Sequence, residues 1–172
     1  MKRVIVVHGG AGKLSFCSDV GASAYERERV LLTIRRALEI GMENLKTSGN
    51  PLDAVEAAVK VLEDEELLNA GIGSVLNIEG NVEMDAAIMD GKTLRAGAVA
   101  MIRNVRHPVS LARKVMEKTD HVLLVGSFAE KLAEILGLEK AEIVTKRRLE
   151  EYRKLKSSFL EGKSNRFKKN LE

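Results

Sequence analysis

Four consecutive acidic residues, Glu63 to Glu66, are the most informative chemical feature of this sequence. They stand where a helix-forming segment gives way to one that contains glycine, so we expect them at the carboxyl end of a helix. Negative side chains there oppose the helix dipole, and the last four backbone carbonyls lack partners within the helix. A hard cation bound by carbonyl oxygens would relieve both problems. On these residues alone, a solvated acidic loop or neutralisation by a nearby arginine is the simpler alternative.

A glycine-rich segment at residues 8–12 follows a short apolar run at residues 3–7. Glycine would let the backbone approach a reacting group closely, and the alternative is an ordinary tight turn after a strand. Nucleotide-binding patterns fail here. A P-loop would need glycine in place of Val7 and a hydroxyl residue in place of Leu14, and the dinucleotide pattern has Ser15 where its third glycine belongs.

The sequence offers no activated nucleophile. It has no Gly-x-Ser-x-Gly elbow, and neither Ser74 nor Cys17 has a base placed beside it by the sequence. The three histidines, His8, His107 and His121, are scattered without the spacing of metal ligands. Taken residue by residue, the chain is therefore not a complete enzyme.

Length and composition limit the class of protein. The 172 residues suit one domain or one half of an obligate assembly. Hydrophobic residues make up 45% of the chain and charged residues 31%, which excludes a disordered or collagen-like protein. A single cysteine permits no intrachain disulfide, no apolar run approaches the roughly 20 residues of a membrane span, and residues 4–7 are too short for a signal-peptide core. We expect a cytoplasmic protein. The many charged residues and the absence of glutamine are typical of thermophilic proteins.

The positive charge is concentrated in residues 145–172, which hold 10 Lys/Arg against 4 Asp/Glu, whereas residues 1–144 hold 18 against 21. Such a tail could bind an acidic partner such as nucleic acid, which would make the chain a non-catalytic binding domain. A solvated helix is the simpler interpretation, because Glu150 and Glu151 interrupt the basic run at helical spacing. Aromatic residues make up only 3%, which argues against base stacking. We expect no nucleic-acid partner.

The elements that must position these residues alternate along the chain. Apolar periodicity, turn residues and helix caps predict buried strands at 3–7 and 121–125, a hairpin of strands at 82–89 and 94–102, and helices at 24–47, from 50 onwards, from 108 onwards, at 127–136 and at 147–160. Helices on a mainly antiparallel strand core indicate an α/β (α+β) fold in which helices cover a sheet. The strands are few, so one face of the sheet needs a partner. We place the main unit at residues 1–144 and a basic helical tail with a flexible linker at 145–172.

Three segments carry a family resemblance when they are taken together and in order. They are residues 6–12, residues 62–63 with 68–76, and residues 84–91 with 94–100. They resemble the plant-type L-asparaginase and isoaspartyl aminopeptidase family of N-terminal-nucleophile (Ntn) hydrolases. The match continues through His107-Pro108 and runs in register from about residue 3 to residue 135, whereas residues 13–24 match poorly.

The resemblance implies a four-layer αββα Ntn-hydrolase sandwich that a separate β subunit completes. Members of the family cleave themselves, and the new N-terminal threonine of β is the nucleophile. This chain ends without such a threonine, so it is similar to an α subunit alone, with its tail preceding the autocleavage point. The implied partners are a β subunit beginning with Thr, in an (αβ)2 assembly, and the implied substrates are L-asparagine or isoaspartyl dipeptides. A glycosylasparaginase or a threonine-protease relative is the alternative within the same fold.

The resemblance also implies site residues. It places no catalytic nucleophile in this chain and no organic cofactor. It implies a structural sodium ion, held chiefly by main-chain carbonyls of Leu62, Glu63, Glu65, Leu68, Ala70 and Ile72. Asn69 resembles a residue that helps to position the nucleophile, and Gly9 and Gly10 resemble a glycine turn packed near the active site.

Overall fold

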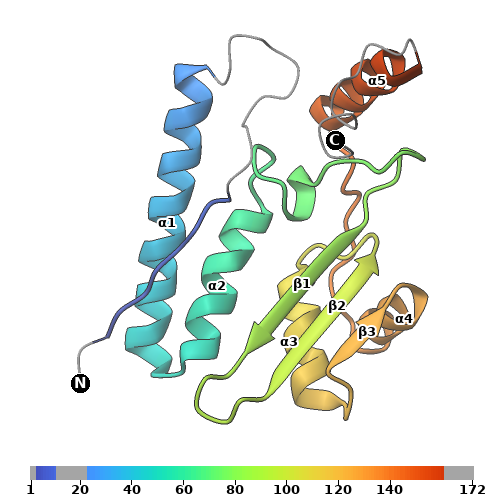
Figure 1. Cartoon of the computed structure of the whole chain (residues 1–172). Helices are drawn as coiled ribbons and strands as arrows, with labels where there is room; N and C mark the ends of the chain where they lie inside the picture. The colour runs from blue at the N-terminus through green and yellow to red at the C-terminus, as the bar shows by residue number, and fades with distance from the viewer. Residues whose placement is uncertain (1–2, 11–22, 161–172) are drawn as a thin grey trace, which may run out of the picture.

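The computed structural model describes residues 3–10 and 23–160 (Figure 1). Its elements, in chain order, are α1 (Ala24–Ser48), α2 (Pro51–Glu63), a short 3-10 turn η1 (Gly71–Gly73), β1 (Met84–Met89), β2 (Ala96–Ile102), α3 (Pro108–Lys118), β3 (Leu123–Val125), α4 (Ser127–Ile135) and α5 (Lys146–Leu160). The mixed α/β class expected from the sequence is confirmed.

Helices α1 and α2 form a hairpin whose ends follow the sequence signals. Ser23 and Glu26 make a capping box at the start of α1, and Gly49 ends that helix in a left-handed conformation. The Asn50 side chain accepts a hydrogen bond from the Leu52 amide at 3.0 Å, as expected of the residue that caps α2. The tight connection places the two helices side by side (Figure 1).

The sheet has three strands in the order β1-β2-β3. The predicted hairpin is present: β1 and β2 pair antiparallel with Ala87 opposite Ala98, and the Asp90 amide donates to the Arg95 carbonyl at 2.9 Å across the turn. β3 pairs parallel to β2, with Leu123 opposite Ala98. Helix α3 supplies the crossover that a parallel pair needs.

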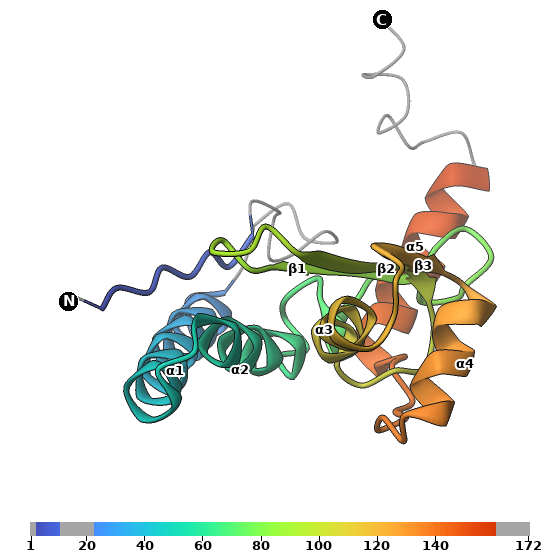
Figure 2. The same cartoon turned by 90° about the horizontal axis from the view of Figure 1, so that it is seen from below.

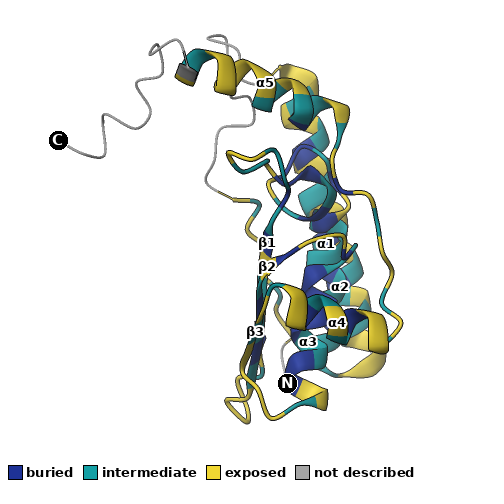
Figure 3. Ribbon diagram, turned by 90° about the vertical axis from the view of Figure 1, so that its right-hand side faces the viewer, coloured by how far each residue is buried: buried dark blue, intermediate teal, exposed yellow. Residues whose placement is uncertain are grey.

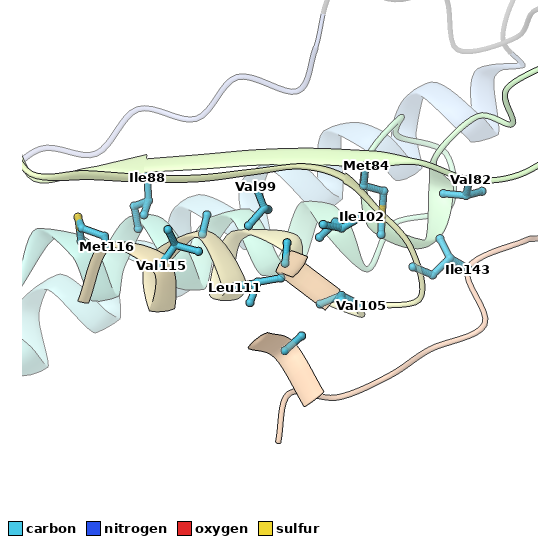
Figure 4. Close-up of a cluster of buried hydrophobic side chains, with 13 residues drawn as sticks. Val82, Met84, Ile88, Val99, Ile102, Val105, Leu111, Val115, Met116 and Ile143 are labelled. Atoms are coloured by element: carbon cyan, nitrogen blue, oxygen red, sulfur yellow. The ribbon is translucent and has the colours of Figure 1, made fainter. Parts of the chain in front are cut away.

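The main core lies between this sheet and helices α3 and α4. Val99 and Ile102 of β2 and Leu111 and Val115 of α3 are at most 1% exposed. In Figure 4 the buried side chains Ile88 of β1 and Val99 and Ile102 of β2 point towards α3. Helices α1 to α4 all lie on this one side of the sheet (Figures 2 and 3).

The opposite side of the sheet is open and mostly apolar. We call Ala87, Met89, Ala96, Ala98, Leu123 and Val125 the open face, because the strand register puts them together. Met89, Leu123 and Val125 are exposed, and Figure 3 shows this side of the sheet at the edge of the molecule. The expectation that β3 is a buried strand is therefore wrong, because nothing among the described residues covers this side of it.

The predicted strand at residues 3–7 is also wrong in part. The segment is extended, and exposure alternates along it: Val4 and Val6 face solvent whereas Ile5 touches Gly41 of α1. It pairs with no strand in the part of the chain that the structure describes, so it is neither part of the sheet nor buried. Alternation sets which side chains face α1, but a strand also requires a neighbour to complete its backbone hydrogen bonds.

No helix of the described segments is long and apolar enough to cross a membrane. The expected flexible linker after residue 160 lies outside the described residues.

Candidate functional site

The acidic run lies at the predicted place, at the end of α2. Glu63 is the last residue of that helix, and the chain then makes a series of tight turns as far as η1. We call residues 62–73 the carbonyl loop. Its backbone folds upon itself: the Glu65 amide donates to Leu62 at 3.2 Å, the Leu68 amide to Glu65 at 3.1 Å, and the Gly73 amide to Ala70 at 3.0 Å.

The Glu63 carboxylate is buried at the amino end of α3. It accepts a hydrogen bond from the Val109 amide at 3.0 Å and lies 3.2 Å from Nδ1 of His107, the residue that precedes α3. Burial raises the pKa of the Glu63 carboxyl, and the hydrogen bonds from His107 and Val109 oppose that rise. His107 is thus a structural partner of the acidic run and opens a helix, as the sequence predicts.

The other three acidic side chains are also paired. Glu65 is buried and binds Arg29 of α1, with 2.9 Å between Nη2 and Oε1, and it accepts hydrogen bonds from Thr33 and the Leu67 amide. The same arginine reaches Glu66 at 3.1 Å, and Arg106 reaches Asp64 at 3.1 Å. For the side chains, neutralisation by local arginines is therefore the correct interpretation. Because these carboxylates already have partners, the backbone carbonyls are the main oxygens left in this loop for a cation.

The backbone of the carbonyl loop suits such a cation. A Cβ atom on Gly71, whose φ is +51°, would lie 2.2 Å from the Glu63 carbonyl oxygen, and one on Gly73 would lie 2.1 Å from that of Leu68 and 2.7 Å from that of Glu65. Three of the six expected ligand oxygens thus crowd around two glycines that have no side chain to block them. A carbonyl that accepts one hydrogen bond keeps a second lone pair for a metal. The donor set, all neutral oxygens, fits a hard monovalent ion.

The described residues contain no group of three or more His, Cys, Asp or Glu side chains able to hold a metal ion. Cys17 lies outside the described residues.

Asn69 stands in the middle of the carbonyl loop and is exposed. Its Oδ1 accepts a hydrogen bond from the Val75 amide at 3.0 Å. That bond fixes the carbonyl end of the side chain and turns the amide nitrogen, a donor of two protons, away from the Val75 amide. An exposed, oriented amide of this kind can hold an oxygen of a group that approaches from outside.

Gly9 connects to the same region through one side chain. A Cβ on Gly9 would lie 2.6 Å from Cδ1 of Ile34, and Ile34 packs on the buried cluster of Val30, Leu67 and Leu68. The next residue, Gly10, donates its amide to Nδ1 of His8 at 3.2 Å, with φ +98°. The glycine turn and the carbonyl loop therefore share one small apolar cluster, although they are far apart in the sequence.

Sequence reasoning missed two residues that hold the carbonyl loop, Arg29 and Arg148. Arg148 of α5 is 2% exposed and donates to the carbonyls of Gly73 at 2.6 Å and Leu68 at 3.4 Å. It lies in the basic run that was interpreted as a solvated helix. No local signal could reveal it, since its partners stand 75 and 80 residues away.

This chain is similar in sequence to known proteins. A family described as "Asparaginase" matches residues 1–170. A plant-type L-asparaginase of Pyrococcus horikoshii is 48% identical over 165 residues, which cover 96% of this chain and 52% of that protein. An isoaspartyl peptidase/L-asparaginase of Xenopus laevis is 49% identical over 150 residues, 86% of this chain and 46% of that protein. The chain thus spans about half the length of the curated relatives that it matches.

Proposed function

Since the chain belongs to the asparaginase family, we propose that it is the α subunit of an amidohydrolase that hydrolyses L-asparagine to L-aspartate and ammonia, and cleaves isoaspartyl dipeptides. The family itself supports an amidohydrolase activity. The open face carries the more specific proposal of a subunit. Helices on one side of the sheet and exposed apolar residues on the other support this proposal, because the second side then needs another layer to cover it.

The occupant of the open face is a β subunit that brings a second sheet and begins with threonine. Exposed apolar area of this kind is unfavourable in water and is removed by packing against another apolar surface. The extended segment at residues 3–7, which pairs with no strand among the described residues, is a second place where a strand of that subunit can add.

The chemistry is then that of an N-terminal nucleophile. The threonine hydroxyl oxygen attacks the carbonyl carbon of the side-chain amide while the threonine α-amino group accepts the hydroxyl proton. The α-ammonium then gives this proton to the amide nitrogen as the C–N bond breaks. Ammonia leaves from L-asparagine, or a free amino acid leaves from an isoaspartyl dipeptide, and an ester to the threonine remains. Water hydrolyses that ester and releases aspartate. In this scheme the α subunit supplies Asn69 to orient the nucleophile.

A sodium ion in the carbonyl loop completes the proposal. Its ligands are the backbone oxygens of Leu62, Glu63, Glu65, Leu68, Ala70 and Ile72. The crowding of carbonyl oxygens around Gly71 and Gly73 supports it. The ion has no part in bond breaking; it holds the loop in one conformation.

The test is an assay of the full-length protein against three substrates. We expect ammonia from L-asparagine and free amino acid from an isoaspartyl dipeptide, and no reaction with an asparagine that carries a sugar on its amide nitrogen. Activity confined to the glycosylated substrate would favour a glycosylasparaginase instead. Absence of all three activities in a folded, assembled protein would contradict the proposal.

Two residues of the basic tail make contacts inside the protein: Arg147 binds Glu26, and Arg148 binds the carbonyl loop. The alternative of a binding domain for an acidic partner therefore rests on the exposed basic residues of α5, which are Lys146, Arg153, Lys154 and Lys156.

A further inference from the structure

Arg148 is a buried charge on a helix that lies outside the main core. Its three guanidinium nitrogens, Nε, Nη1 and Nη2, each contact a different group. Nε donates to the Gly73 carbonyl at 2.6 Å, Nη2 to the Leu68 carbonyl at 3.4 Å, and Nη1 lies 2.7 Å from Oε2 of Glu151. A guanidinium taken out of water is costly unless its donors are used, and here each side of the fork has a partner.

The two carbonyls stand on either side of Asn69. Leu68 precedes Asn69 directly, and Gly73 follows it by four residues. The planar Arg148 guanidinium therefore bridges the two ends of the segment 68–73. The Nε–H and Nη2–H groups on one edge of the arginine guanidinium point the same way in one plane with fixed spacing. A lysine ammonium carries its charge at a single atom and matches this pair of carbonyls less well.

A network of ion pairs also fixes the position of the Arg148 guanidinium. Glu151, one turn along α5, also receives Arg147 at 3.1 Å, and Arg147 reaches Glu26 in the first turn of α1 at 2.9 Å. The Tyr152 hydroxyl donates to the Ile78 carbonyl at 3.0 Å. These contacts fix α5 to two other parts of the chain, so the position of Arg148 is set independently of the loop that it binds.

We propose that Arg148 is a positioning residue: it fixes the segment 68–73 and, through it, the orientation of Asn69 towards the reacting group. The proposal rests on the function proposed above, because it assigns Arg148 a purpose in that reaction. In this proposal helix α5 supports the segment that carries Asn69. Arg148 touches neither the substrate nor the nucleophile in this account, and it acts only through the backbone that carries Asn69.

The test compares three variants of the full-length protein. Arg148→Met removes the charge and keeps the length of the side chain, Arg148→Lys keeps the charge and removes the fork, and Arg153→Met changes an exposed arginine of the same helix as a control. Amide hydrogen exchange of residues 68–75 and steady-state kinetics with L-asparagine are measured for each.

In Arg148→Met we expect exchange in this segment to be about tenfold faster, since the loop opens locally. We expect kcat to fall about tenfold while KM changes by less than about threefold, because orientation rather than substrate affinity is lost. Arg148→Lys should lie between this variant and wild type on both measures, and Arg153→Met should match wild type. If Arg148→Met does not fold, Arg148→Lys decides by the same two measures, with circular dichroism to show that it is folded.

Wild-type exchange and kcat in the folded Arg148 variants would overturn the proposal. So would faster exchange with unchanged kcat, since Arg148 would then be structural only. If the wild-type protein hydrolyses neither substrate, the proposed function fails and Arg148 has no reaction to serve. The exchange comparison then still shows whether the guanidinium fixes the segment.

Discussion

Gly71 shows how a single residue sets the shape of the carbonyl loop. Its φ of +51° is in the left-handed region, and a Cβ there would lie 2.2 Å from a backbone oxygen. We expect Gly71→Ala to destabilise the protein by about 2 to 4 kcal/mol, since the added carbon must displace backbone rather than a flexible side chain. Gly91→Ala is the matched control, because a Cβ at Gly91 has nothing within 4 Å. Equal thermal unfolding temperatures of the two variants would contradict this description of the loop.

At the residue scale, sequence reasoning identified the acidic run, its place at a helix end and an arginine as one alternative for its neutralisation, but not which residues pair with it. Glu63 finds His107 44 residues away and Glu65 finds Arg29 36 residues away. Periodicity and capping rules describe neighbours along the chain, and such pairs depend on the tertiary fold. The assignment of the six carbonyl oxygens came from the family resemblance, because every residue has a carbonyl and residue type cannot single out a main-chain ligand.

Arg113 of α3 makes ion pairs to two carboxylates of α2. Arg113 reaches Asp53 and Glu56 of α2 at 2.7 Å each, and Glu117 of its own helix at 2.7 Å. Burial disfavours its charged form, but the hydrogen bonds to these carboxylates raise the pKa of Arg113 overall. The Arg113 hydrogen bond, in turn, lowers the pKa of Asp53 below its usual value. A carboxyl with a depressed folded pKa stabilises the fold above its unfolded pKa, and this contribution is lost as the pH falls through the folded pKa.

Asp53→Asn should therefore lower the free energy of unfolding by about 1 kcal/mol near pH 6 and by much less near pH 3. Denaturant unfolding of both proteins at the two pH values measures the difference. A deficit that stays the same at both pH values would mean that the pair does not contribute through the charge of Asp53.

Sodium binding is tested through stability. A ligand that binds only the folded state raises the unfolding temperature with its concentration. We expect the full-length protein to unfold about 2 to 4 °C higher in NaCl than in choline chloride of the same ionic strength, which corresponds to about 1 kcal/mol. Identical unfolding curves in the two salts over a wide range of concentration would argue against a sodium ion in the carbonyl loop.

The elements themselves were largely predictable where local signals define them. The hairpin of strands expected at residues 82–89 and 94–102 and the helices expected from residues 50 and 108 onwards are all present. The strands at residues 3–7 and 121–125 were the exceptions. Their apolar runs correctly indicate extended backbone. Whether an extended segment is buried and paired depends on the elements that pack against it. No described part of this chain covers the open face.

At the scale of the whole molecule, the open face should be the surface that binds the β subunit. Leu123 on this face is 52% exposed, and Ile135, the last residue of α4, is 71% exposed. Leu123→Asp in the full-length protein should prevent stable assembly, because packing would bury an unpaired carboxylate at a cost of several kcal/mol. Ile135→Asp should assemble like wild type. Size-exclusion chromatography compares the two variants, and normal assembly of Leu123→Asp would place the interface elsewhere.

The central claim is that this chain is one of two products of a self-cleaving hydrolase. Intact-mass analysis of the purified full-length protein tests it most directly. We expect two chains whose masses sum to that of the precursor plus one water, the second beginning with threonine, and aspartate formation that appears as the precursor disappears. A single uncleaved chain that persists on incubation, or that is fully active without cleavage, would contradict the account.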